Sequence, residues 1–469
     1  MTPNHTKQYS RIPSALIWAQ CITFALLYAV WMIYELLYFR RVLLISGALL
    51  SVFSIYQYRT YLFQKKALAL WLMVGLFFWA IFHLIFLAQD YPAQFLELRR
   101  IWKYAGLGGI FALGLGISLA SLDSEKIKPY WAIIYFGLCL PVLIYLLRYF
   151  LTIYGAPLGI TSPAILKINF STTAYYIPKT DYIAFCLPLL GLSLGQILRI
   201  LTLGVRLKLR QYLPACIYFI TITAILFLFS TQNTKNGIAY AAILIGLFLV
   251  SALKKTSSVK FWHKALILIT VGVLAITTLY SNLQKNDAWR TLITDTKIGL
   301  QLEKYPHWKD ASGISLPNNE FGEVVSGSTY VRAAWFKAGL LLSAHTPLGY
   351  GLIEDSFGRL AKARWPDSQN LSHSHSGWLD LILGIGFPGF CCIFSALILN
   401  IWQSRALNEP WKSLVFWALI ANLVLWVTTE VAATTSFSVL IFWISLASGL
   451  TLMDKARENG LIKGPPKRI

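Results

Sequence analysis

Charged residues are scarce in this sequence, and their scarcity excludes an ordinary soluble domain. Only 13% of the 469 residues are charged, whereas 57% are hydrophobic. Soluble domains carry about twice that share of charged residues. The balance found here is typical of a helical membrane protein with several spans.

Common metal and phosphate motifs are also missing. The sequence has no Asp-x-Asp triplet, no His-Glu-x-x-His and no phosphate-binding glycine-rich lysine loop. Its six cysteines all fall inside apolar runs, and none has metal-ligand spacing. We therefore expect no metal site and no cofactor. The sequence shows no internal repeat either, which weakly disfavours many transporter folds.

Apolar runs of about 17–25 residues are long enough to span a membrane as helices. They predict an all-α polytopic membrane protein with about twelve transmembrane helices. The runs are 14–37, 42–58, 67–88, 102–121, 130–150, 182–202, 213–230, 237–253, 265–281, 375–402, 411–430 and 433–453.

The net charge of +21 would suggest nucleic acid in a soluble protein. Here the basic residues sit in short loops beside helix ends, where they orient the chain and meet anionic membrane lipids. No basic stripe leaves the membrane plane, so we expect no nucleic-acid partner. Loop charge predicts both termini in the cytoplasm. The inner groups are Arg59/Lys65/Lys66, Lys126/Lys128, Arg206/Lys208/Arg210, Lys254/Lys255/Lys260/Lys264 and the tail.

This orientation divides the chain into four parts. Residues 1–281 form nine spans, 282–374 form a large outer loop, 375–453 form three spans, and 454–469 form a basic cytoplasmic tail. The loop has ten Lys/Arg and nine Asp/Glu, so it is nearly neutral. Its four tryptophans predict a packed cap, and apolar spacing from Ala334 to Leu342 predicts a helix at the membrane interface. Two basic groups, Arg40/Arg41 and Arg99/Arg100/Lys103, fall on the outer side, and we favour a structural role over an anionic site.

His375 is the first candidate for chemistry. It lies where the polar loop enters an apolar helix, and a neutral imidazole there can accept a proton. His373 is two residues away, so the two rings would face different directions if the segment were helical. The alternative is a pair of ordinary interface histidines.

Arg332 is the second candidate. It follows a Ser/Gly-rich turn at the start of an expected helix and precedes Trp335 by one turn. An arginine near free backbone N–H groups suits phosphate oxygens. The alternative is an arginine whose head reaches the interface while its stem packs on apolar surface.

Lys235 is the third candidate, because it opens a helix between Thr234 and Asn236. A cation at that positive dipole end is unfavourable unless an anion also binds, although an exposed loop lysine is an equal alternative. Asp380 and Glu430 lie in or at the edge of apolar runs, which makes each a candidate for a functional site. His83, inside a helix, is better explained as a satisfied core histidine.

Three motifs resemble the bacterial O-antigen ligase and polymerase superfamily of membrane glycosyltransferases. The resemblance covers about 215–400. It is carried by Thr234-Lys235-Asn236-Gly237, by Arg332 and Trp335 followed by Pro347-Leu348-Gly349-Tyr350-Gly351, and by His375-Ser376-Gly377-Trp378-Leu379 with Gly384-Ile385-Gly386-Phe387-Pro388-Gly389. Lys235 stands where the family usually has Arg, and Ser376 where it has Asn.

The resemblance implies an enzyme in the bacterial inner membrane with a periplasmic active site. Its donor would be an undecaprenyl-diphosphate-linked glycan, and its acceptor a sugar hydroxyl of lipid A-core oligosaccharide. His375 would act as general base, and Arg332 with Lys235 would bind the diphosphate. His373, Asn236, Trp335 and Asp380 would be supporting residues.

Other branches fit the same motifs. A polymerase would extend a lipid-linked chain, and a protein O-oligosaccharyltransferase would glycosylate a Ser or Thr. Members of the latter branch often carry an extra C-terminal region, whereas this sequence runs about sixteen residues past its last expected helix; we favour the ligase. A lipid-linked glycan transporter is a more distant alternative, and it would carry charged residues deep in several helices.

Overall fold

Every regular element in the described part of the chain is helical. The computed structural model describes residues 12–168, 171, 173–202, 209–255, 261–285, 289–310, 316–429 and 434–453. Within these ranges extended backbone meets only at two isolated bridges, Asp310 with Gln369 and Asn318 with Val324. The prediction of an all-α fold is therefore confirmed.

The α-helices follow one another along the chain, and several of their connections contain 3-10 turns. A π-helical turn at Leu98–Trp102 joins α4 to α5. The helices are α1 (Ser14–Val30), α2 (Leu37–Gln57), α3 (Leu68–Phe86), α4 (Tyr91–Glu97), α5 (Lys103–Ala120), α6 (Ile127–Tyr154), α7 (Lys179–Thr202), α8 (Leu209–Thr231), α9 (Lys235–Lys255), α10 (Phe261–Lys285), α11 (Leu292–Gly299), α12 (Gly327–His345), α13 (Ser356–Arg364), α14 (Gly377–Gln403), α15 (Trp411–Leu425) and α16 (Thr434–Leu452).

Nine helices in the described ranges are long and apolar enough to cross a membrane. They contain α2, α3, α5, α6, α7, α8, α9, α14 and α16. Three shorter apolar helices, at Ser14–Val30, Ile269–Ser281 and Trp411–Leu425, account for the remaining predicted runs. A polytopic membrane protein is therefore supported, whereas the count of about twelve spans is not confirmed.

The centre of the bundle is built on close contact between α5 and α16. A Cβ atom on Gly116 would lie 2.5 Å from the carbonyl oxygen of Leu446, and one on Gly449 would lie 2.4 Å from that of Leu113. Small residues let two helix backbones approach where hydrophobic burial alone does not drive association. Around this pair, α14 packs along α3 and α15 packs along α7.

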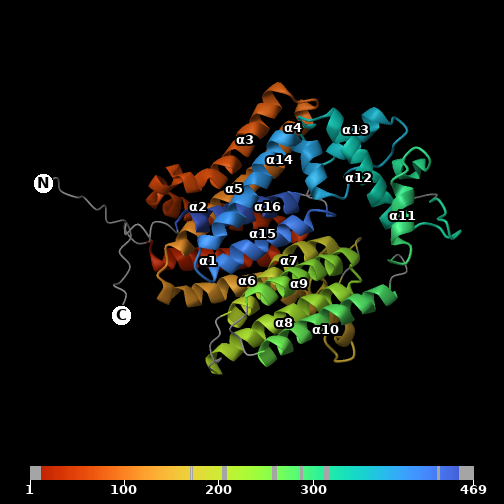
Figure 1. Cartoon of the computed structure of the whole chain (residues 1–469). Helices are drawn as coiled ribbons and strands as arrows, with labels where there is room; N and C mark the ends of the chain where they lie inside the picture. Colours follow the sequence, from red (N-terminus) through yellow and green to blue (C-terminus); the bar gives the residue numbers. More distant parts are fainter. Residues whose placement is uncertain are drawn as a thin grey trace.

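The segment after α10 forms a cap at one end of the bundle, where Figure 1 shows α11, α12 and α13 together. We call residues 289–310 and 316–376 the cap. Its own hydrophobic cluster surrounds Trp308, Tyr330 and Trp335, and it includes Leu379 and Leu383 from α14. A packed cap was predicted from the tryptophans, and the buried Trp308 and Trp335 agree with that prediction.

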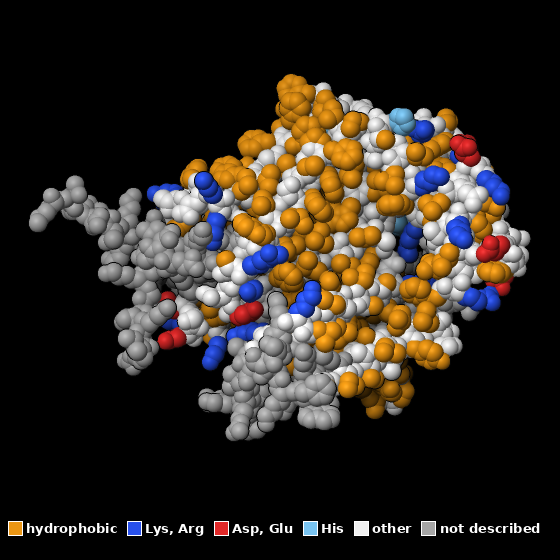
Figure 2. Space-filling model, in the orientation of Figure 1, with side chains coloured by type: hydrophobic (Ala, Val, Ile, Leu, Met, Phe, Trp, Pro, Cys, Tyr) orange, Lys and Arg blue, Asp and Glu red, His pale blue; other side chains and the backbone are white. Residues whose placement is uncertain are grey.

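Side-chain chemistry changes along the long direction of the molecule. Figure 2 shows hydrophobic side chains across the middle of one face and charged side chains gathered toward its two ends. Such a band is what helices surrounded by lipid require.

The arginines Arg40 and Arg41, which we expected on the outer side, make contacts within the protein. Arg40 is buried and donates hydrogen bonds to the carbonyl of Trp31 (2.9 Å) and the hydroxyl of Thr435 (3.0 Å). The guanidinium of Arg41 lies 4.9 Å from the ring centroid of Tyr104. These contacts agree with the structural role expected for this group.

Some predictions fall on residues outside the described ranges. They concern Glu430, the basic residues Arg206, Lys208 and Lys260, and the tail 454–469.

Candidate functional site

The site is built where the cap meets the bundle, around an aromatic stack between Trp335 and His375. The two ring centroids are 5.1 Å apart and the rings are nearly parallel, at 16°. Trp335 is 6% exposed, and its Nε1 donates to the carbonyl of Trp308 at 2.8 Å. Because the indole is held on its other edge by this bond, it is a firm platform for the imidazole.

His375 lies in a turn just before α14 rather than inside that helix. It has a left-handed backbone with φ of 59°, which costs a non-glycine residue on the order of 1 kcal/mol. The expected helix start at 375 is therefore two residues early, since α14 begins at Gly377.

Asp380 holds this turn from the first turn of α14. Its Oδ1 accepts hydrogen bonds from the backbone N–H of Ser374 (2.8 Å) and from the Ser374 hydroxyl (2.7 Å). The carboxylate is 4% exposed, and a buried acceptor with two short donors orders the residues on either side of Ser374. Asp380 therefore acts on the two histidines through the backbone between them.

His373 was expected to point away from His375 if the segment were helical. The segment is not helical, and the two rings meet edge to face with centroids 5.3 Å apart. The structure thus brings both histidines to one place. Beside them, burial raises the pKa of the Asp355 carboxyl above its ordinary value, against the opposing effects of Arg359 and His373.

Arg332 lies one turn before Trp335 on the same face of α12, since residues three apart on a helix are neighbours. The helix begins at Gly327, so Arg332 is beyond the first turn and not among its free N–H groups, as the sequence had suggested. Its Nε is buried and has no hydrogen-bond partner among the described residues. A buried donor without an acceptor calls for an explanation, and a bound anion is one.

Lys235 is the first residue of α9, as predicted, and it is close enough to Arg332 for the two charges to repel. Lys235 is half-buried, and neither cation has an ion pair or a hydrogen bond with a described residue. The carboxylate of Asp295 offsets part of this repulsion. Two neighbouring cations whose repulsion one carboxylate offsets only in part suit a ligand with more than one negative charge.

Asp295 had no signal in the sequence that separated it from the other acids of the loop. It lies on α11, is fully buried, and accepts hydrogen bonds from the Thr291 hydroxyl (2.7 Å) and the backbone N–H of Ser326 (2.9 Å). Ser326 caps α12, so Asp295 also fixes the helix that carries Arg332. Only the folded cap brings this carboxylate near Lys235.

Asn236 has a structural contact in place of a free amide. Its Nδ2 donates to the carbonyl of Thr428 at 3.2 Å. One turn later, the hydroxyl of Tyr240 bonds the hydroxyls of Thr428 and Thr429. These bonds tie the start of α9 to the segment after α15, which places Lys235 against the bundle.

No group of three or more His, Cys, Asp or Glu is placed to hold a metal ion within the described ranges. A small pocket lies elsewhere, lined by residues of α3, α4 and α14 with Trp102 and Gly351, and it contains none of the three predicted site residues.

Taken together, these features describe a polytopic helical membrane protein with a candidate site of cations and histidines where the cap meets the bundle. Residues 217–394 match the family model described as O-antigen ligase. This range contains Lys235, Arg332 and His375, and it confirms the resemblance seen in the motifs. Over this range the chain is similar to the O-antigen ligase superfamily, and the match supports that superfamily. A comparison with curated proteins found no match.

Proposed function

We propose that this protein is an O-antigen ligase. It transfers a glycan from undecaprenyl diphosphate to a sugar hydroxyl of lipid A-core oligosaccharide. The observation that carries the proposal is the grouping of His375, Trp335 and Arg332, with Lys235 beside them, inside the range that matches the family model. The family match supports the superfamily, and the choice of the ligase reaction is ours.

In the proposed reaction His375 is the general base. The acceptor hydroxyl loses its proton to the imidazole while its oxygen bonds to the anomeric carbon of the donor. The bond between that carbon and the phosphate oxygen breaks, and undecaprenyl diphosphate leaves with the bonding electrons. A positioned base contributes about 10²–10⁴-fold to such a rate.

Arg332 and Lys235 supply the charge that the leaving group requires. Negative charge develops on the diphosphate as the glycosidic bond breaks, and cations fixed in a half-buried site stabilise it more than water does. Among the described residues neither cation has an ion pair, and the Asp295 carboxylate offsets only part of their mutual repulsion. In this mechanism they do the work that a divalent metal does in many other phosphate-dependent transferases.

The orientation of the chain is part of the same proposal. Loop charge puts the large loop, 282–374, in the periplasm and the tail 454–469 in the cytoplasm. The site then lies at the periplasmic face of the inner membrane. Both lipid-anchored substrates can reach it by lateral diffusion.

The test uses a strain that lacks its own ligase. We expect His375→Ala to abolish long-chain lipopolysaccharide on a gel, while wild-type protein restores it. His345→Ala is the matched control, because His345 is an exposed histidine at the end of α12. Normal long-chain material with His375→Ala would overturn the assignment. Loss of chain extension with capped core retained would identify a polymerase.

A further inference from the structure

One face of the short helix α4 forms hydrogen bonds with the cap. Asp90 caps α4, and Gln94 and Glu97 follow at spacings of four and three residues, which puts all three side chains on one face. We call these three residues the α4 face. Each of them contacts or closely approaches the cap segment 349–359, and the hydrogen bonds join residues 256–269 apart in sequence.

Glu97 contacts this segment through both of its side-chain oxygens. Its two carboxylate oxygens accept hydrogen bonds from consecutive backbone N–H groups, Oε1 from Ile353 at 2.5 Å and Oε2 from Glu354 at 3.0 Å. The side chain is 7% exposed. Hydrogen bonds that are shielded from water in this way are electrostatically stronger than bonds exposed to it.

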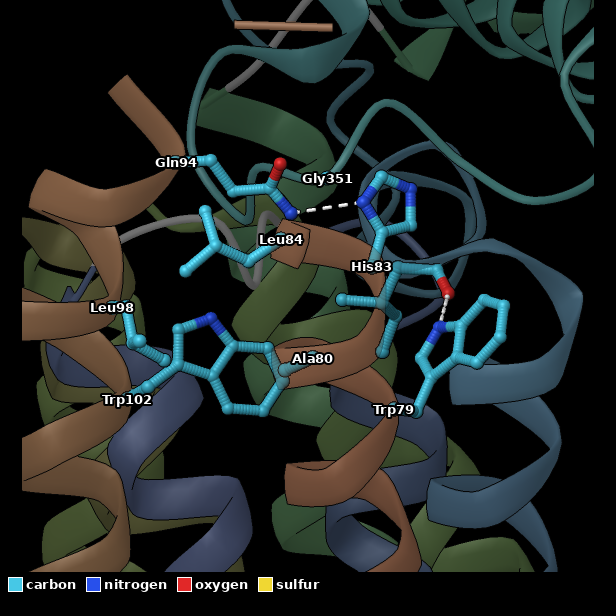
Figure 3. A pocket seen from close by; sticks show the side chains of 9 residues that line it. Trp79, Ala80, His83, Leu84, Gln94, Leu98, Trp102 and Gly351 are labelled. Carbon is cyan, nitrogen blue, oxygen red and sulfur yellow. Dashed lines mark hydrogen bonds between the residues drawn. The ribbon is translucent and has the colours of Figure 1, made fainter. Parts of the chain in front are cut away.

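Gln94 lies beside the same segment. Figure 3 shows its amide directed at His83, and its Nε2 donates to His83 Nδ1 at 2.9 Å. The Nε2 of His83 then carries the proton and faces the carbonyl of Gly349 at 3.4 Å. A Cβ atom on Gly351 would lie 2.5 Å from the Gln94 amide, so the chain passes directly against this side chain.

Asp90 holds the far end of the segment. Its Oδ1 accepts from the N–H of Ala93, and its Oδ2 accepts from Arg359 Nη1 at 2.5 Å. These bonds, the first of them foremost, hold the pKa of the Asp90 carboxyl below its ordinary value. Arg359 belongs to α13, which begins two residues after Glu354. The α4 face therefore fixes the entry to α13 and a side chain on its second turn.

The helix held in this way packs against the turn that carries the histidines. The backbone N–H of Gly358 approaches the carbonyl of Ser372 at 3.4 Å, and there is no room for a side chain at Gly358 beside Leu371. Phe357 contacts Trp335, with ring centroids 6.1 Å apart. Trp335 in turn stacks on His375.

We infer that Glu97 is a positioning residue for His375, acting through α13. It touches neither His375 nor the reacting atoms, but it sets where α13 lies, and α13 bears on both the His373–His375 turn and the Trp335 platform. The catalytic consequence rests on the proposed function. The effect of Glu97 on the position of α13 does not rest on the proposed function.

Glu97→Gln tests the effect of Glu97 on the position of α13, because the substitution keeps the side-chain volume. One oxygen becomes an NH2 group that faces a backbone N–H, so one acceptor is lost and two donors oppose each other. Hydrogen–deuterium exchange is measured on the full-length protein in nanodiscs. We expect peptides covering 349–358 and 371–376 to exchange about tenfold faster or more than in wild type. Leu96→Ala, an exposed neighbour on α4, should leave exchange unchanged.

Two results would overturn the inference. The first is wild-type exchange throughout Glu97→Gln. The second is faster exchange confined to 349–358, because the effect would then stop before the histidines. Glu97→Asp keeps the carboxylate, so it should recover part of the protection.

A transfer assay on the same proteins then measures the catalytic consequence. We expect Glu97→Gln to lower kcat about tenfold to a hundredfold, with the donor KM nearly unchanged, since about 1 Å of misplacement can cost that much. An unchanged kcat in an active enzyme would overturn the positioning role. If His375→Ala is itself fully active, the proposed function fails. The exchange measurement would still show whether Glu97 holds residues 349–358 and 371–376 in place.

Discussion

At the scale of single residues, contacts with neighbouring side chains set the position of the His375 ring, because His375 lies in a turn and not in a helix. Asp380 bonds the residue before it, and Trp335 provides a surface for its ring. Neither contact could be read from the spacing of His373 and His375. The sequence did indicate that these residue types belong to one outer site.

Arg332→Lys addresses the phosphate-binding role. Lysine keeps the charge but loses the planar fork of donors that can grip two phosphate oxygens. We expect kcat/KM for the donor to fall about tenfold to a hundredfold, which corresponds to the loss of one charged hydrogen bond. Transfer from a purified lipid-linked donor at varied donor concentration measures the change.

Arg290→Lys is the control for that substitution. Arg290 lies in the same cap, but it is exposed and pairs with Glu323 at the surface. Its replacement should leave donor kinetics unchanged. Equal kinetics for Arg332→Lys and wild type would argue against a diphosphate clamp at Arg332.

At the scale of elements, the two glycine-containing motifs of the sequence, 347–351 and 384–389, contact each other in the structure. We call this contact the crossing. The chain at 347–351 runs against a break in α14, where Tyr350 N–H donates to Leu383 and Gly351 N–H donates to Gly384. At the break, Gly386 has φ of 69° and ψ of 176°, a conformation nearly restricted to glycine. The crossing ties the end of α12 to α14, the helix that the His375 turn precedes.

Gly386→Ala should destabilise this crossing. The new Cβ would sit 2.4 Å from the carbonyl oxygen of Leu348, on a backbone that alanine rarely adopts. We expect a loss of about 2 kcal/mol or more, seen as a lower melting temperature in detergent. Gly75→Ala in α3 is the control, since nothing lies within 4 Å of its added Cβ. Equal melting temperatures for the two variants would contradict the proposed role of the crossing.

Element boundaries were predicted within a few residues where apolar runs are long, as for α7 and α9. The break in α14 was not predicted, because Gly384 to Gly389 lies inside an apolar run and an apolar run alone reads as one helix. What breaks the helix is a segment from elsewhere in the chain, which a local pattern cannot report.

At the scale of the whole molecule, the bundle and the cap have separate hydrophobic clusters that meet at α14. The bundle depends on the backbone contact between α5 and α16, and this contact leaves no room for a large side chain. We expect Gly116→Leu to force the helices apart at a cost of several kcal/mol.

Fluorescence-detected size exclusion measures this loss as a smaller monodisperse peak and earlier heat-induced aggregation. Gly75→Leu is the matched control on an open helix surface. If both variants behave like wild type, the α5–α16 contact is not essential to the bundle.

The sequence by itself determined the class of this protein. Scarce charge, long apolar runs and one polar loop leave no other way to satisfy the backbone than helices in lipid, and the motifs at Lys235, Arg332 and His375 indicated the superfamily. The tertiary structure decided which side chains meet. Asp295 bonds another part of the cap, Asp380 bonds the cap from α14, and Glu97 bonds the cap from α4. For Asp295 and Glu97 the residues that they bond are distant in sequence. Such contacts depend on where helices cross, and crossing points are set by packing in three dimensions rather than by local periodicity.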